Sequence, residues 1–150
     1  RCRQVGAILH SDATQSVGHH PVNVDTLDVD LLSFSAHKFY GPKGVGGLFV
    51  RRRERMIRLQ SQIVGGGQQD NRRSGTLNSV GIVGMASALV KAVAVMPEED
   101  QRLRFLRDSF WRQLQSFGAE RNGPAWDPSL RLNRNINCRW NLIEGQAMML

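Results

Sequence analysis

Residues 31–50 constrain the fold of this chain more than any other stretch, because two short apolar runs here enclose a polar bend. The runs are LLSFSA and GGLFV. Short apolar runs bounded by glycine are typical of buried strands. The bend between them carries Ser35, His37, Lys38 and Tyr40 among its glycines. We therefore predict two buried strands of an α/β fold, joined by a segment that holds more reactive groups than a turn requires.

Lysine is scarce in this chain, and two of its three lysines fall in the bend. These two are Lys38 and Lys43, the third is Lys91, and arginine supplies the rest of the twenty basic residues. Arginine stays protonated in proteins, whereas a lysine amine can lose its proton and attack a carbonyl group. The alternative is a solvated lysine at a strand end, since most surface lysines have no specific role.

The residues next to Lys38 favour the chemical interpretation. Ser35 and His37 are two positions apart, so in an extended strand their side chains would face the same pocket. A hydroxyl, an imidazole and the backbone N–H groups of a glycine-rich bend together suit an anion. A nucleophilic amine beside a phosphate site is what a pyridoxal phosphate enzyme requires.

The composition limits the other classes of function. With 150 residues, of which 41% are hydrophobic and 22% charged, the chain can form one ordinary globular core. The net charge of +7 is compatible with nucleic-acid binding, but the arginines are dispersed apart from Arg51–Arg53 and accompany no nucleic-acid motif. No apolar run reaches the roughly 20 residues that span a bilayer. We therefore expect neither a nucleic-acid nor a membrane partner.

The cysteines and the chain ends suggest where the protein is located and whether the chain is part of a longer one. Cys2 and Cys138 lie far apart, without the spacing of a metal site or of a disulfide framework. The chain opens without a signal peptide, so we expect a cytoplasmic protein with no metal. It also begins without Met and stops at EGQAMML, which is typical of a helix start. We expect a piece of a longer protein.

Upstream of the bend, the run VGAILHS at residues 5–11 predicts a fully buried parallel strand. Asp12 follows directly, where open α/β sheets place groups that contact ligands. An equally good interpretation is that Asp12 caps the next segment. Gln15 could face the same crevice, whereas His19 and His20 match no metal spacing and are predicted to be solvated.

Downstream of the bend, Arg51–Arg53 are expected to lead the strand into water, although one of them could reach an anionic ligand. A polar loop rich in hydrogen-bond donors follows at residues 68–76. A helix is then predicted from residue 78 or 79 to Pro97, which interrupts it. Its buried face would be Val80, Val83, Ala86, Leu89 or Val90, and Val93.

A second helix is predicted at residues 98–117, followed by a half-buried strand at residues 132–142. The buried stripe of this helix would be Leu103, Leu106, Phe110, Leu114 and Phe117, widened by Trp111. The composition changes near Pro97, from a strand-rich region to a helical one. We therefore predict one domain at residues 1–96 and the start of another at residues 97–150.

The chain resembles the cysteine desulfurases of the NifS/IscS type, in the class V aminotransferase family. The resemblance rests on SDATQSVG, VDLLSFSAHKFYGPKGVGGLFVRRR, GGGQQDNRRSGTLNSVGIVGM and NLIEGQAMML. It implies part of the large domain of a fold-type I pyridoxal phosphate enzyme, with a mostly parallel sheet flanked by helices. Residues 97–150 would then be a connecting helix and the beginning of the small C-terminal domain.

The resemblance also implies roles for individual residues. Lys38 would carry pyridoxal phosphate covalently, and Ser35 and His37 would bind its phosphate. Asp12 would pair with the pyridine nitrogen, and Gln15 would hydrogen-bond the phenolic oxygen. The remaining match is the threonine at position 76, which would reach the phosphate of the partner subunit in a homodimer.

The implied reaction removes sulfur from L-cysteine to give alanine and a persulfide on an enzyme cysteine, for delivery to a sulfur acceptor or an iron-sulfur scaffold protein. The family places that cysteine beyond residue 150, so neither Cys2 nor Cys138 is assigned to it. The fragment alone is expected to be inactive. The alternatives are a selenocysteine lyase, another class V enzyme, or a non-catalytic dimerising fragment.

One local departure concerns the polar loop. The family usually has Gln-Glu-x-Gly where this chain has Gln68, Gln69, Asp70 and Asn71. The missing acid and glycine affect the expected contacts of the loop with a partner subunit or a substrate.

Overall fold

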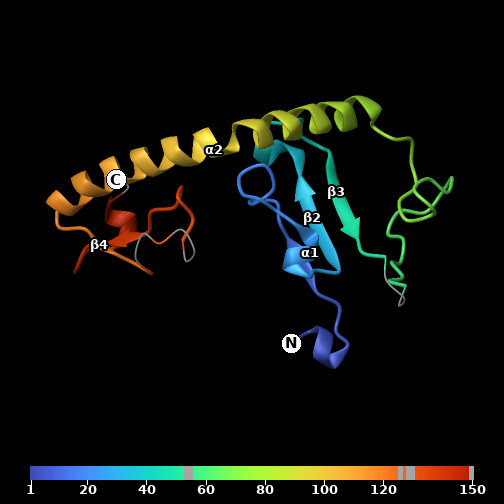
Figure 1. Ribbon diagram of the computed structural model, residues 1–150, viewed down its shortest axis with the longest axis horizontal. Coiled ribbons are helices and arrows are strands. Elements are labelled where there is room, and N and C mark those ends of the chain that lie inside the picture. The colour runs from blue at the N-terminus through green and yellow to red at the C-terminus, as the bar shows by residue number, and fades with distance from the viewer. Residues whose placement is uncertain (53–55, 125–126, 128–130, 149–150) are drawn as a thin grey trace. The chain divides into compact units, whose positions relative to one another are not determined.

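The computed structural model describes residues 1–52, 56–124, 127 and 131–148. The chain divides into two compact units, Arg1–Met96 and Pro97–Leu150. The first unit holds a three-stranded sheet, and the second holds a two-stranded one (Figure 1). The assignment of the two units to a large and a small domain stays a prediction.

The sheet of the first unit is mixed, with strand order β1-β2-β3. β1 (His10–Asp12) runs parallel to β2 (Leu31–Ser35), which runs antiparallel to β3 (Gly46–Val50). The extents of the predicted strands at LLSFSA and GGLFV are confirmed nearly to the residue, but the prediction that both are buried is wrong, because β3 holds no buried residue and its Leu48 is 51% exposed. Figure 1 shows β2 and β3 side by side, joined by the bend at residues 36–45.

The core of this unit lies on one face of the sheet, where β2 buries Leu32. Phe39, in the bend, is fully buried. The bend begins with the 3-10 helix η2 (Ala36–Phe39). The buried side chains that form the core are Ala13, Val17, Val29, Leu32, Ala36 and Phe39. Because two of these six belong to η2, burial of apolar surface anchors the helix that carries Lys38.

The first strand is shorter and more exposed than predicted. A 3-10 helix, η1 (Arg3–Val5), replaces its start, and β1 begins only at His10. Val5 is 74% exposed and Ile8 is 50% exposed, so the prediction of a fully buried strand over residues 5–11 is wrong. Its parallel direction is confirmed. β1 has one neighbour, β2, among the described strands, so the backbone groups along its other edge have no strand partner there.

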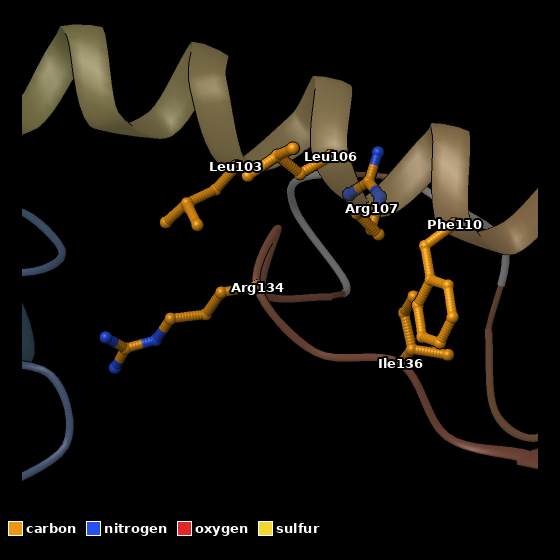
Figure 2. A pocket seen from close by; sticks show the side chains of 6 residues that line it. All are labelled: Leu103, Leu106, Arg107, Phe110, Arg134 and Ile136. Carbon is orange, nitrogen blue, oxygen red and sulfur yellow. The ribbon is translucent and has the colours of Figure 1, made fainter.

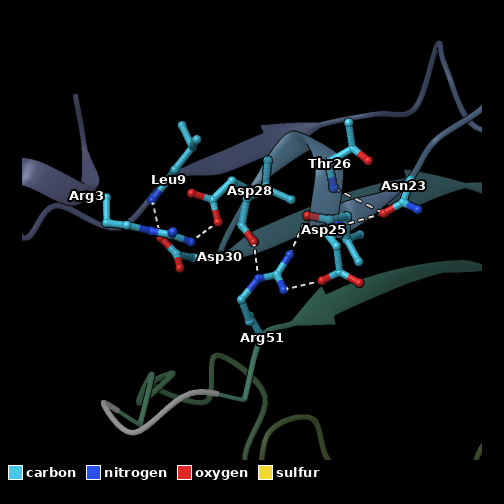
Figure 3. A network of polar contacts seen from close by, with 10 residues as sticks. Arg3, Leu9, Asn23, Asp25, Thr26, Asp28, Asp30 and Arg51 are labelled. Carbon is cyan, nitrogen blue, oxygen red and sulfur yellow. Dashed lines mark hydrogen bonds and ion pairs between the residues drawn. The ribbon is translucent and has the colours of Figure 1, made fainter.

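Arg51 anchors a short helix, α1 (Val24–Leu27), to the end of β3 (Figure 3). Its guanidinium donates to the Val29 carbonyl at 2.7 Å, to Asp25 Oδ1 at 2.6 Å and to the Val24 carbonyl. Arg51 is therefore engaged within the fold, and the prediction that it points into water is wrong. Position 53 lies outside the described residues.

The two helices predicted around Pro97 form one element, α2 (Ser79–Ser116). A proline inside a helix removes one N–H donor and clashes with the preceding turn, yet its φ is compatible with the helix. Here Pro97 does not end the helix, and the predicted interruption is wrong.

The buried face of α2 in the first unit matches the prediction only at Leu89. Met85, Ala88, Leu89 and Ala92 pack against the core, whereas Val83 is 69% exposed. The other predicted valines, Val80, Val90 and Val93, are likewise exposed. The helix backbone approaches the bend closely at Gly84, where an added Cβ would lie 3.2 Å from Pro42 Cγ.

By length and composition alone, α2 qualifies as a candidate membrane span. It contains an 18-residue window with a mean hydropathy of 1.9, of which 6% is buried. The prediction that no segment reaches this length is therefore wrong on this criterion. Core helices and signal sequences meet the same criterion, so the window does not by itself assign the helix to a membrane.

The second unit pairs β4 (Glu120–Arg121) with β5 (Cys138–Arg139) and ends in a 3-10 helix, η3 (Gly145–Met148). The strand predicted at residues 132–142 is reduced to β5. Trp111 is buried, but the predicted buried stripe is wrong at three of its five positions, because Leu106, Phe110 and Phe117 are exposed. Arg107 is buried too and donates to Asn133 Oδ1 at 3.0 Å.

A cavity of about 360 Å³ opens between α2 and the segment before β5 (Figure 2). It is lined by Leu103, Leu106, Arg107, Phe110, Arg134 and Ile136. Figure 2 shows that the guanidinium of Arg134 points away from the other lining side chains.

Candidate active site at the ends of β1 and β2

Asp12 and Ser35 lie on the same face of the sheet. Asp12 pairs with Ser33 across the parallel strands, and Ser35 is two residues further along β2. Paired residues of neighbouring strands point to the same side, as do residues two apart in one strand. The contact between His10 Nε2 and Ser33 Oγ, at 3.1 Å, lies between the same two strands. The carboxylate and the hydroxyl therefore share an edge and a face.

Ser35 and His37 contact each other directly. Ser35 Oγ and His37 Nδ1 are 2.8 Å apart, across the junction between β2 and η2. The expected proximity is seen, but its cause differs from the prediction, because His37 belongs to a 3-10 helix and not to the strand. The side chain of His37 is exposed. The pair offers a hydroxyl and an imidazole to an anion in solvent.

Lys38 is half-buried and sits between His37 and the fully buried Phe39 on η2. The helix ends at Phe39, and the backbone N–H of the next residue, Tyr40, donates to the Ala36 carbonyl. Tyr40 adopts a left-handed conformation with φ 66°, which is uncommon for a bulky residue. Lys38 thus lies two residues before Tyr40, whose left-handed backbone ends the helix.

The turn after β1 packs against this helix. His19 Nε2 lies 2.6 Å from the Lys38 carbonyl oxygen, so the prediction of a solvated His19 is wrong. Gly18 has φ +81°, and a Cβ added there would lie 2.5 Å from Phe39 Cβ. Only glycine allows this approach without a shift.

Asp12 accepts a hydrogen bond from the Thr14 backbone N–H at 2.9 Å. The contact expected of a capping residue is therefore present, although residues 14–19 form a turn and not a helix, and the role of Asp12 toward a ligand stays a prediction. Hydrogen bonds from Thr14, with a smaller contribution from the charge of His10, hold the pKa of the Asp12 carboxyl below its ordinary value. An exposed carboxylate with a lowered pKa is negatively charged at neutral pH.

The other two predicted site residues are Gln15 and Thr76, and both are exposed. Gln15 is exposed in the turn that follows Asp12. Thr76 is exposed in the loop before α2, and no contact described for residues 56–124 joins it to the strand ends. The structure thus places Asp12 and Ser35 on one face of the sheet and joins Ser35 to His37, which Lys38 follows in the chain, but it shows no contact of Thr76 with them.

The loop that carries Thr76 is organised by its own hydrogen bonds. Gln68 Oε1 accepts from the Gly75 backbone N–H at 2.9 Å, and the Ser74 N–H donates to the Ile63 carbonyl at 3.0 Å. The two residues that depart from the family pattern, Gln69 and Asn71, and Asp70 between them all have left-handed φ values of 53° to 60°. Asparagine tolerates this conformation better than most residues, which makes Asn71 a workable substitute for glycine.

The donor set suits a phosphate group and an aldehyde better than a metal. Ser35, His37 and the amine of Lys38 follow one another along a single turn, and they are donors and a nucleophile. Among the described residues, no cluster of three His, Cys, Asp or Glu side chains could hold a metal ion.

Two residues at this edge were missed by sequence reasoning. Thr14 was not singled out, although a residue two positions after an aspartate is a common partner of its side chain. His19 carried no usable signal, because it contacts a backbone carbonyl nineteen positions away.

Comparison with known proteins places the chain in a family. The family model described as aminotransferase class V matches residues 1–148. The chain is 48% identical over 144 residues to the cysteine desulfurase IscS of Dictyoglomus turgidum, covering 95% of this chain and 35% of that relative. It is 43% identical over 150 residues to the cysteine desulfurase IscS of Shewanella baltica, covering 99% and 36%. The chain thus spans about a third of the length of the curated relatives it matches.

Solved structures agree with this comparison. A NifS-like protein superposes with a TM-score of 0.80 at 37% identity, covering 95% of this chain and 37% of that one. DndA from Streptomyces lividans superposes with a TM-score of 0.82 at 31% identity, covering 99% and 41%. The predicted fold class, an α/β part of the large domain of a fold-type I enzyme, is confirmed, as is the resemblance to cysteine desulfurases. The chain belongs to the class V aminotransferase family.

Proposed function

We propose that the full-length protein is a pyridoxal phosphate-dependent cysteine desulfurase, and that residues 1–96 supply the lysine side of its cofactor site. One observation carries the proposal: Ser35, on the same face of the sheet as the Asp12 carboxylate, pairs with His37, and Lys38 follows directly in the chain. The four groups are an amine, two anion donors and one acid. The names of the relatives point to the same activity.

Each residue has a role that its chemistry allows. Lys38 binds the cofactor covalently through its amine, and Ser35 and His37 donate hydrogen bonds to its phosphate. Asp12 carries a negative charge at neutral pH, so it can accept a hydrogen bond from a protonated ring nitrogen. When bound, pyridoxal phosphate supplies an electron-withdrawing ring for bond breaking at the substrate. Gln15, exposed next to Asp12, would hydrogen-bond the phenolic oxygen.

The sulfur transfer needs a thiolate of the enzyme. That thiolate attacks the sulfur of L-cysteine, an S–S bond forms, and the C–S bond breaks. The electron pair of the C–S bond stays with the substrate carbon, which takes up a proton and becomes alanine. We place the persulfide on a cysteine other than Cys2 and Cys138, and a sulfur-acceptor or iron-sulfur scaffold protein would receive it.

We further propose that the protein is a homodimer in which Thr76 reaches the phosphate of the partner subunit. The exposed position of Thr76, in a loop whose hydrogen bonds are internal, supports this arrangement. The cytoplasmic location stays a prediction.

The test measures alanine formation from L-cysteine by the full-length protein with pyridoxal phosphate. We expect activity in the wild type and in Lys43→Ala, whose lysine lies five positions further along the bend, and no activity in Lys38→Ala. Turnover by Lys38→Ala would end the assignment. Preference for L-selenocysteine over L-cysteine would favour a selenocysteine lyase instead.

A further inference from the structure

We propose that His19 is a positioning residue that holds the peptide group of Lys38 and thereby sets the direction of its amine. The inference rests on the proposed function of Lys38 and adds to it a residue that the motifs do not indicate. Asp12 and His19 lie at the two ends of one short segment, residues 12–19. Asp12 would contact the cofactor, and His19 would hold Lys38.

The contact itself defines the state of the imidazole. His19 Nε2 lies 2.6 Å from the carbonyl oxygen of Lys38 in a partly buried position. A carbonyl oxygen only accepts hydrogen bonds, so Nε2 must carry a proton. The His19 side chain therefore donates a hydrogen bond to the backbone of Lys38, the residue that carries the reactive amine.

Neighbouring contacts hold the turn and η2 together at three successive residues. Gly18 approaches Phe39 so closely that an added Cβ would be 2.5 Å from Phe39 Cβ. The rings of His19 and Tyr40 meet edge to face, with centroids 6.4 Å apart and planes at 76°. Lys38, Phe39 and Tyr40 thus all contact the same turn, and Lys38 does so through its carbonyl oxygen.

A helix of four residues cannot hold this geometry alone. The last carbonyl groups of a helix have no partner within it, and so short a helix is not stable by itself. The Lys38 carbonyl finds its partner in His19. Displacement of a reacting group by about 1 Å can cost on the order of a hundredfold in rate, so a fixed peptide at Lys38 matters for the amine it carries.

The first experiment reads the contact without any cofactor. In full-length protein labelled with ¹⁵N-histidine and stripped of pyridoxal phosphate, the nitrogen shifts of His19 report which ring nitrogen is protonated, and His19→Leu assigns the signal. We expect a proton on Nε2. The opposite tautomer, protonated only on Nδ1, would overturn the proposal.

The second experiment measures how fast pyridoxal phosphate becomes trapped on Lys38 by borohydride after its addition to stripped full-length protein. We expect His19→Leu to slow attachment about tenfold, as the loss of one good hydrogen bond allows. His19→Gln keeps an amide donor and should recover most of the rate. His10→Leu is the matched control, because His10 contacts the Ser33 hydroxyl and not Lys38.

The outcomes separate this inference from the function on which it rests. A purely structural role would lower the melting temperature of His19→Leu and leave its attachment rate at the wild-type value, which would overturn the positioning role. Equal slowing in His19→Gln and His19→Leu would overturn it too, because the donor would then be irrelevant. A wild type that attaches no cofactor to Lys38 would defeat the proposed function and the positioning role together.

Discussion

The strand ends and the loop before α2 make opposite contributions to the predicted site. At the strand ends, Asp12, Ser35, His37 and Lys38 are linked by register, a hydrogen bond and a helix anchored in the core. Thr76 instead lies in an exposed loop that hydrogen-bonds mainly to itself. The first group is organised within one subunit, whereas the proposed role of Thr76 depends on a second one.

The strand ends and the loop also differ in how their side chains are packed. Phe39 is fully buried beside Lys38, so displacement of η2 would expose core side chains to water. In the loop, Ser74 is buried but Thr76 is exposed, and three consecutive residues adopt left-handed conformations. We therefore expect substitutions at the strand ends to have larger effects than substitutions in the loop.

The largest expected effect is on turnover. Asp12→Asn keeps the shape of the side chain but removes its charge, so kcat of the full-length enzyme should fall about 10²- to 10³-fold. Thr76→Val removes one hydrogen bond to phosphate and should weaken cofactor binding by about tenfold or less. Alanine formation and cofactor titration measure the two effects. An Asp12→Asn enzyme at the wild-type rate would reduce Asp12 to a capping residue.

A smaller effect is expected on stability, where Gly18→Ala and Gly44→Ala distinguish the cost of overpacking from the cost of backbone strain. Gly18 and Gly44 have nearly the same φ, +81° and +79°, but only Gly18 has a neighbour within 4 Å of an added Cβ. Both substitutions to alanine incur the left-handed cost of about 1–2 kcal/mol. Gly18→Ala should lose about 1–3 kcal/mol more through overpacking against Phe39. Urea unfolding measures the difference, and equal losses would mean that the turn is loosely packed.

The smallest effect concerns the loop. Gln69→Gly should stabilise the protein by about 1 kcal/mol, because glycine adopts φ 53° without strain. Asn71→Gly should gain less, since asparagine already tolerates φ 60°. The melting temperatures of the two variants give the order. A larger gain at position 71 would contradict the view that Asn71 replaces glycine there.

Strands β2 and β3 could be predicted from the sequence because their apolar runs are short, strong and bounded by glycine. The proximity of Ser35 and His37 was also predictable, since residues two apart cannot lie far from each other. Such local features depend on a few residues that are close together in the sequence, so the sequence pattern alone can predict them.

The packed face of α2 could not be predicted in the same way. Its valines are exposed, whereas Met85, Ala88, Leu89 and Ala92 pack against the core and Gly84 lies close to Pro42. Hydrophobicity measures the gain from burial, whereas close approach to Pro42 depends on shape. The contact of His19 with Lys38 was also out of reach, because it requires the three-dimensional pairing of β1 with β2.

The most direct test of the central claim is to map the lysine that binds pyridoxal phosphate. The full-length protein is reduced with borohydride in the presence of the cofactor, digested and analysed by mass spectrometry. We predict that the label lies on Lys38, the residue that follows the Ser35–His37 pair. Label on Lys43 or Lys91 instead would contradict the account.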